Sequence, residues 1–217
     1  MSEAIGPVLF KELDSLLDNY SELALSPSRA GSILIVGQVS VGTEIPGGQL
    51  QESFDVKISV PLSFPAEMPS FAEVGGRIPS AYHHLSEDSL CLGAPLRLKE
   101  VVRAGGLLGL VNQCLVPYLV GFLLVEAGHP LPYGELQHGL PGLLEEYSRY
   151  FMTQDRRQVH RYLLLLGMKK RLANKRPCPC AGGRRLGKCH NRMLTRLRTL
   201  ASRSWFREHA NYFGGYS

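Results

Sequence analysis

The sequence predicts an α+β fold, in which an antiparallel β-meander flanked by helices is followed by a helical segment and a small cysteine-rich knuckle. One segment alternates apolar and polar residues, others carry one-sided apolar stripes, and three of the five cysteines crowd between positions 178 and 189. Charge also divides the chain: residues 1–150 hold 8 Lys+Arg against 17 Asp+Glu (net −9), and residues 151–217 hold 16 against 2 (net +14). We therefore expect a domain over 1–150, a basic helical linker over 151–175, and a knuckle with a C-terminal helix over 176–217.

The first elements are a helix and a meander. Apolar residues at positions 8, 9, 13, 16 and 17 predict an amphipathic helix over residues 8–20. Residues 33–41 are rich in β-branched side chains, and residues 50–60 alternate apolar with polar, so both predict strands around a turn at 44–49. Three prolines between positions 61 and 69 take the chain out of the sheet before a short strand near 70–74. The prediction is a three-stranded antiparallel meander after a helix.

The middle of the chain is predicted to be a loop followed by helices. Residues 77–99 lack periodicity and predict an irregular loop with a short extended piece around Cys91. Residues 106–125 are almost continuously apolar, so they predict a buried helix that Pro117 kinks or restarts, with Cys114 in its core. Helices are also predicted over 143–152 and over 156–172, whose basic C-terminal end suits the helix dipole.

No membrane segment is expected. The first residues lack the basic start and apolar stretch of a signal peptide, and the apolar run 114–125 contains a proline and is too short to span a bilayer. Cys91 and Cys114 have no disulfide-framework spacing. We expect a soluble cytoplasmic protein.

The segment "CPCAGGRRLGKCH" predicts a metal site. Three thiolates and an imidazole make a tetrahedral Zn²⁺ set, and these ligands are Cys178, Cys180, Cys189 and His190. Glycines between them allow tight folding, and nearby basic side chains offset the thiolate charge. A full set of four protein ligands favours a structural role, and the alternative is free cysteines in a basic tail.

This segment resembles the SEC-C motif, a small zinc-binding module appended to many bacterial proteins. All four ligands match, while Ala181-Gly182-Gly183 replaces the usual Gly-Ser-Gly. The resemblance implies a docking element that recruits macromolecules.

The order of elements in residues 5–150 resembles that of ubiquitin-conjugating enzymes (the UBC fold). "FPAEMP" stands where that family has a proline-rich turn, His83 or His84 stands at its flap histidine, and "EDSLCLG" stands where it presents the thioester-forming cysteine. The resemblance implies that Cys91 is the catalytic nucleophile and that His83 or His84 orders the flap or assists proton transfer. Ser89 or amides near Leu92 would stabilise the oxyanion. The Pro-Asn that follows the family histidine is replaced here.

These resemblances imply a bacterial ubiquitin-like conjugation system, with antiviral defence as its setting. The chain would take a ubiquitin-like modifier from an activating enzyme onto Cys91 and pass it to a target protein. One alternative is an inactive binding protein of the same fold, in which Cys91 is a core residue. Another is a nucleic-acid-associated zinc adaptor, whose basic C-terminal region would offer Trp205, Phe206, Tyr212 and Phe213 for stacking. His129 and His138 lie in a Gly/Pro-rich loop and are interpreted as loop residues.

Overall fold

The computed structural model describes residues 6–27, 31–86, 89–131 and 139–214, and its fold is α+β, as predicted. Two compact units make up the chain. Unit 1 comprises Met1–Gly93 and Val101–Glu135, and unit 2 comprises Ala94–Glu100 and Leu136–Ser217. The β-sheet lies in unit 1 and the cysteine-rich knuckle lies in unit 2.

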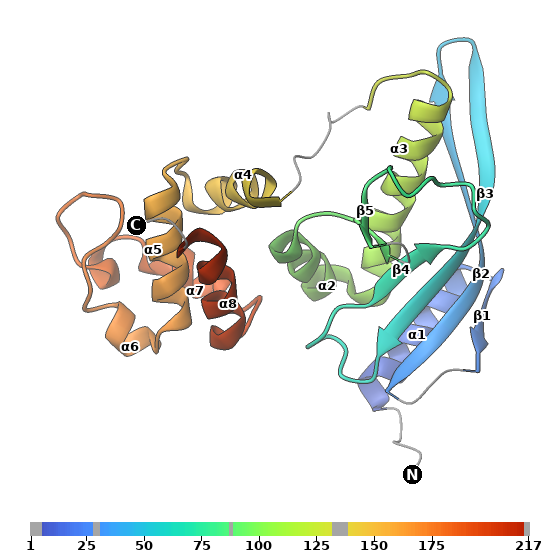
Figure 1. Cartoon of the computed structure of the whole chain (residues 1–217). Helices are drawn as coiled ribbons and strands as arrows, with labels where there is room; N and C mark the ends of the chain where they lie inside the picture. The colour runs from blue at the N-terminus through green and yellow to red at the C-terminus, as the bar shows by residue number, and fades with distance from the viewer. Residues whose placement is uncertain (1–5, 28–30, 87–88, 132–138, 215–217) are drawn as a thin grey trace. The chain divides into compact units, whose positions relative to one another are not determined.

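Unit 1 is built on a four-stranded antiparallel sheet in the order β1-β2-β3-β4 (Figure 1). The strands are β1 (Leu23–Ser26), β2 (Ser32–Ile45), β3 (Gly48–Pro61) and β4 (Ser70–Glu73). β2 and β3 form a long hairpin whose register runs from Ser32↔Pro61 to Ile45↔Gly48. The predicted alternation of β3 is confirmed, because its four inward side chains are at most 1% exposed: Phe54, Val56, Ile58 and Val60. The prediction of three strands is wrong, because the sheet has a fourth strand, β1. β1 has only four residues, one of them buried, and so shows no alternation that the sequence could reveal.

Helices cover this sheet and complete its core. α1 (Pro7–Asn19) buries Leu9, Leu13 and Leu16, the stripe predicted for it. α3 (Val116–Glu126) packs on β2, and the ring of Phe122 meets Phe54 of β3 edge-on at 6.0 Å. Burial of these apolar side chains is the main force holding unit 1 together.

The apolar helix begins earlier than predicted. α2 (Pro95–Leu110) starts eleven residues before position 106, and it continues through a π-helical turn, η1 (Val111–Leu115), into α3. Gly106 interrupts α2 with φ 61° and ψ −149°, and a Cβ there would collide with the Glu12 carboxylate, which accepts a hydrogen bond from the Leu107 N–H at 2.7 Å. A restart near Pro117 is confirmed, because this proline lies in the first turn of α3.

The continuous helical segment Pro95–Glu126 is long and apolar enough to be a candidate membrane-spanning helix. Within the described part of the chain it is the single helix that could cross a bilayer by length and composition, with a mean hydropathy of 1.9 over its most apolar window. Of that window, 56% is buried inside the protein, and the core helix of a soluble protein passes the same test.

Unit 2 is helical and centred on α5 (Arg156–Gly167), which contacts four neighbouring helices (Figure 1). These are α4 (Gly139–Phe151), α6 (Lys170–Ala173), α7 (Asn191–Leu197) and α8 (Arg203–Gly214); the short 3₁₀-helix η2 (Leu186–Lys188) precedes α7. The helix predicted over 156–172 is divided into α5 and α6, because the backbone of Met168 is extended (φ −88°, ψ 159°). Arg198 and Arg207 then donate hydrogen bonds to the last carbonyls of α5. A C-terminal helix, α8, is present as predicted.

A buried carboxylate caps the start of α2 inside unit 2. One oxygen of Glu146 in α4 accepts a hydrogen bond from the Arg97 N–H at 2.7 Å, and its other oxygen is buried without a hydrogen-bond partner among the described residues. Burial raises the pKa of Glu146 to about 7, although the backbone N–H groups of Arg97 and Leu96 favour the charged form.

This raised pKa predicts a pH-dependent stability for unit 2. Because the pKa of Glu146 rises from 4.5 to about 7 on folding, the folded chain holds the extra proton. The free energy of unfolding that this proton contributes is therefore complete below pH 4.5 and is lost as the pH rises through 7. The total loss is at most about 3 kcal/mol. Glu146→Gln keeps an acceptor for the Arg97 N–H and cannot ionise, so its stability is expected to fall less between pH 5.5 and pH 8. Thermal unfolding of the metal-loaded chain, followed by fluorescence of the single tryptophan, Trp205, measures this. A difference between variant and wild type that stays constant with pH would contradict it.

Candidate functional site

The knuckle of unit 2 is folded by a short backbone ladder. The Cys178 N–H donates to the Arg184 carbonyl at 2.9 Å, and the Leu186 N–H donates to the Arg176 carbonyl at 2.9 Å. Between these bonds Pro177 and Arg185 form an antiparallel bridge. The chain thus turns back on itself over 178–184 and brings its first two cysteines toward the third.

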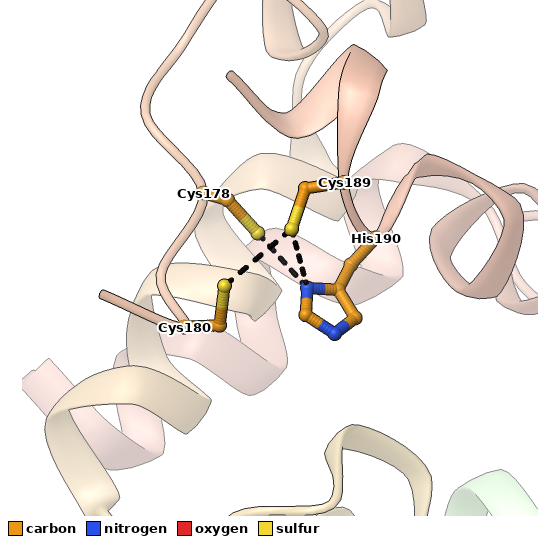
Figure 2. Close-up of side chains that lie close together, drawn as sticks. All are labelled: Cys178, Cys180, Cys189 and His190. Carbon is orange, nitrogen blue, oxygen red and sulfur yellow. Dashed lines mark hydrogen bonds between the residues drawn. The ribbon is translucent and has the colours of Figure 1, made fainter. Parts of the chain in front are cut away.

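The four predicted metal ligands converge on one point (Figure 2). Their ligand atoms all lie within 4.8 Å of one another. The Nδ1 atom of His190 lies 3.1 Å from the Cys178 sulfur and 3.3 Å from the Cys189 sulfur, and the sulfurs of Cys180 and Cys189 are 3.5 Å apart. A tetrahedral zinc site with usual bond lengths has ligand–ligand edges of roughly 3.6 to 3.8 Å. These three separations are slightly shorter than those edges, and the four ligand atoms of this Cys₃His cluster are close enough to hold one metal ion.

Groups around the cluster stabilise the thiolate of Cys178, whereas burial and the neighbouring thiols raise the pKa of Cys189. Burial raises the pKa of Cys178, but hydrogen bonds from the Cys180 backbone and from His190 outweigh it, and the pKa lies below its ordinary value. The Tyr162 hydroxyl lies 3.7 Å from the Cys178 sulfur, and an Arg184 guanidinium nitrogen lies 3.8 Å from the Cys189 sulfur. Burial, and then the Cys178 thiol, raise the pKa of Tyr162, so its hydroxyl remains a donor at neutral pH. Such outer contacts orient metal ligands.

The cluster is part of the unit 2 core. Tyr162 comes from α5, is 1% exposed, and stacks on Phe151 of α4 with ring centroids 4.8 Å apart. Leu186 of η2 and Leu194 of α7, which flank the second pair of ligands, are fully buried. Four protein ligands leave no open coordination position, so the arrangement suits a structural metal.

Cys91 lies in unit 1, directly after a small hairpin. The hairpin pairs β5 (His84–Ser86) with β6 (Ser89–Leu90), and the Cys91 N–H donates to the His83 carbonyl at 2.7 Å. Leu90 is buried and anchors the hairpin, while Cys91 itself is only partly buried. The loop predicted for 77–99 is thus partly ordered as a hairpin and ends where α2 begins at Pro95.

His83 precedes this hairpin in a constrained conformation. Its φ is 41°, and its ring meets the ring of Tyr82 edge-on at 4.8 Å. The side chain of His84, together with Glu87 and Asp88, lies outside the described residues. Both predicted histidines lie near the cysteine by their backbones: the His83 carbonyl accepts from the Cys91 N–H, and His84 pairs with Leu90.

Tyr118 is a residue of this site that sequence reasoning missed. Its hydroxyl reaches from α3 to the Tyr82 carbonyl at 2.9 Å and to the His83 carbonyl at 3.4 Å. Burial, then Tyr82 and then Cys91, raise the pKa of Tyr118, so its hydroxyl stays protonated and able to donate. Tyr118 is the single hydroxyl-bearing residue in the apolar run 106–125, which distinguishes it in the sequence but does not indicate its partners.

The remaining predicted positions lie elsewhere. Cys114 is buried in η1, as expected of a core cysteine, and none of the five cysteines, all of them described, forms a disulfide. His129 follows α3, where its N–H donates to the Leu124 carbonyl at 2.7 Å, and His138 lies outside the described residues. A hollow of about 300 Å³ in unit 1 is lined by the ion-paired Glu52, Arg77 and Glu126 and does not include Cys91.

Comparison with protein-family models, with curated proteins and with solved structures found no match to this chain.

Metal removal is predicted to affect unit 2 alone. Cys178→Ser should lower the bound metal, measured by elemental analysis of the purified protein, because it removes one of four ligands. Cys91→Ser is the matched control and should leave the metal content unchanged. Chelation should change the fluorescence of Trp205 in unit 2 while hydrogen exchange of the β2–β3 hairpin stays slow. Loss of protection in that hairpin on chelation would show that the two units do not fold independently.

Proposed function

We propose that the chain is a ubiquitin-conjugating-like enzyme that carries a ubiquitin-like modifier as a thioester on Cys91. The supporting observation is the position of Cys91, a partly exposed cysteine directly after the β5–β6 hairpin. Its backbone N–H donates to the carbonyl of His83, the residue before β5. The order of elements also suits a UBC-like fold, because a helix and an antiparallel meander precede the cysteine and a long helix follows it. A protein-sized substrate binds across a surface, so a deep pocket at the cysteine is not required.

The reaction is an acyl transfer in two steps. The Cys91 thiolate attacks the C-terminal carbonyl carbon of the modifier, a new C–S bond forms, and the bond to the thiol of the activating enzyme breaks. The departing thiolate takes up the proton that Cys91 has lost. A lysine amine of the target then attacks the same carbonyl, a C–N bond forms, and Cys91 leaves and is reprotonated from the amine.

The surrounding groups have distinct roles in this proposal. Backbone N–H groups after the cysteine, near Leu92, and the partly buried Ser89 stabilise the oxyanion. Tyr118 is a positioning residue, because its hydroxyl fixes the carbonyls of Tyr82 and His83 and so fixes the backbone that holds Cys91. His83 or His84 would assist proton transfer, as the family resemblance implies.

The Cys₃His cluster gives the carrier a second, non-catalytic part. We assign it a zinc ion and the recruiting role of the SEC-C motif that it resembles, acting in the cytoplasm on partners of the conjugation reaction. When bound, the metal cross-links the knuckle, while the chain's own Tyr162 and Arg184 hold its ligands in place.

One observation favours an inactive binding protein instead. The family asparagine is replaced in the flap, where Leu85 and Ser86 are exposed, and residues 77–99 contain neither asparagine nor glutamine. A chain of this kind would hold the modifier without forming a thioester. The loading experiment below separates the two functions.

The proposal predicts a thiol-sensitive adduct on Cys91. The purified chain is mixed with ATP and with the ubiquitin-like modifier and activating enzyme whose genes we expect beside its own, and intact mass is recorded. Cys91→Ser should give a thiol-resistant oxyester or no adduct, while the matched Cys178→Ser should still load. Loading and release by Cys91→Ser at the wild-type rate would refute the assignment, and binding of modifier without any adduct would favour the inactive protein.

Tyr118→Phe tests the positioning role within the same assay. It keeps the ring packed against Tyr82 and removes one hydrogen bond, so loading should slow by roughly 2- to 10-fold, the usual worth of such a bond. Tyr150→Phe is the control, because it also removes a bonded hydroxyl, the one that donates to Glu100 at 3.0 Å in unit 2. Equal rates for Tyr118→Phe and wild type would remove Tyr118 from the site.

A further inference from the structure

The basic residues of the knuckle gather on the backbone ladder that closes it. The bonds from Leu186 N–H to the Arg176 carbonyl and from Cys178 N–H to the Arg184 carbonyl place two basic stretches side by side. A third bond, from the Gly187 N–H to the Asn174 carbonyl at 3.1 Å, continues this pairing. Five exposed cations therefore share one small region, here called the basic ladder: Lys175, Arg176, Arg184, Arg185 and Lys188.

Little negative charge opposes this region. Residues 151–217 contain 16 Lys+Arg and only two carboxylates, Asp155 and Glu208. Asp155 is already used, because its side chain caps the N-terminus of α5 by accepting from the Arg157 N–H at 2.8 Å. Glu100 pairs with Arg196 of α7 at 2.9 Å, outside the basic ladder. Arg184 also lies beside the Cys189 sulfur, so the four other charges face solvent without a carboxylate partner among the residues that the structure describes and attract a polyanion.

The surface of the basic ladder also lacks an apolar anchor. The large exposed apolar side chains described in unit 2 are Met152, Leu164, Leu172 and Tyr212, and none of them lies in the fully described segment 174–190. Exposed residues of that segment are mainly cations and glycines. Protein–protein interfaces usually have an apolar, charge-depleted centre, whereas contacts to nucleic-acid phosphates come from Arg, Lys and backbone N–H groups.

The aromatic residues that would stack on single-stranded bases are partly occupied. Phe206 and Phe213 are 0% and 3% exposed in the unit 2 core. Trp205 is partly buried and stacks on His209 with ring centroids 3.6 Å apart, while Tyr212 is 60% exposed. The burial of Phe206 and Phe213 thus removes two of the four aromatic residues that the nucleic-acid alternative offered for stacking, and none of the four lies in the basic ladder.

We infer that the basic ladder docks on the phosphodiester backbone of double-stranded nucleic acid, without reading its sequence. Arginine and lysine head groups contact successive phosphates, and the intervening glycines let the backbone approach closely. This binding is independent of the carrier function proposed for Cys91. It would hold the carrier on nucleic acid while its modifier is transferred.

Binding of labelled duplexes to the full, zinc-loaded chain tests this inference. Fluorescence anisotropy is recorded with mixed-sequence DNA and RNA duplexes over a range of salt concentrations, and polyglutamate serves as the acidic-peptide probe. The expected result is duplex binding that weakens with salt and exceeds polyglutamate binding. Absence of duplex binding at low salt, or tighter binding of polyglutamate, would overturn the inference.

Two variants with the same charge change locate the surface. One carries Lys175→Gln, Arg185→Gln and Lys188→Gln in the basic ladder, and leaves out Arg184 because it contacts a metal ligand. The other carries Arg157→Gln, Arg161→Gln and Arg203→Gln, exposed positions on α5 and α8. In the first variant, loss of three phosphate contacts should reduce the slope of log(binding constant) against log(salt concentration) by about 2.7. It should also weaken binding by at least about 10-fold. The second should change affinity much less.

Metal content and Trp205 fluorescence of both variants serve as the folding control. With folding intact, equal losses in the two variants would mean that charge is spread over unit 2, and this would contradict a docking surface at the basic ladder.

Discussion

The convergence of three thiols and one imidazole within 4.8 Å is the constraint on which unit 2 depends. Several of its elements are short, since α6 has four residues, η2 three and α7 seven, and helices of this length are not stable alone. Tyr162 connects the ligands to the aromatic core, because it lies beside Cys178 and stacks on Phe151. A metal ion at this point would join the ends of the knuckle to α5 and so complete the unit.

Unit 1 is stabilised differently, and its candidate site reflects this. Its core comes from the alternating side chains of β2 and β3 and from the helices packed on them. The hairpin that precedes Cys91 is held at its open end, where the buried Leu90 pairs with His84 and the Tyr118 hydroxyl bonds the Tyr82 carbonyl just before β5. A rigid sheet with a tethered, partly exposed cysteine suits a residue that must be reached by large partners and still keep its orientation.

The sequence allowed the β2–β3 hairpin and the metal ligands to be predicted, because alternation and ligand spacing are local signals. It did not reveal β1, which is too short to show a pattern, or the start of α2, because residues 77–99 lack periodicity, which is typical of a loop. The role of Tyr118 depends on a contact between residues 36 positions apart, which no local pattern contains. For the same reason, the basic residues at 175–176 and 184–188 could be counted from the sequence but joined into one surface only by the ladder.

We propose that the five cysteines divide into a reactive carrier, a core residue and three metal ligands. Alkylation by iodoacetamide, mapped by mass spectrometry, tests this division in one measurement on the metal-loaded chain. We expect Cys91 to react in the native protein, Cys178, Cys180 and Cys189 to react only after chelation, and Cys114 to react only after unfolding. A Cys91 that reacts no faster than Cys114, or knuckle cysteines that react as fast as Cys91 before chelation, would contradict it.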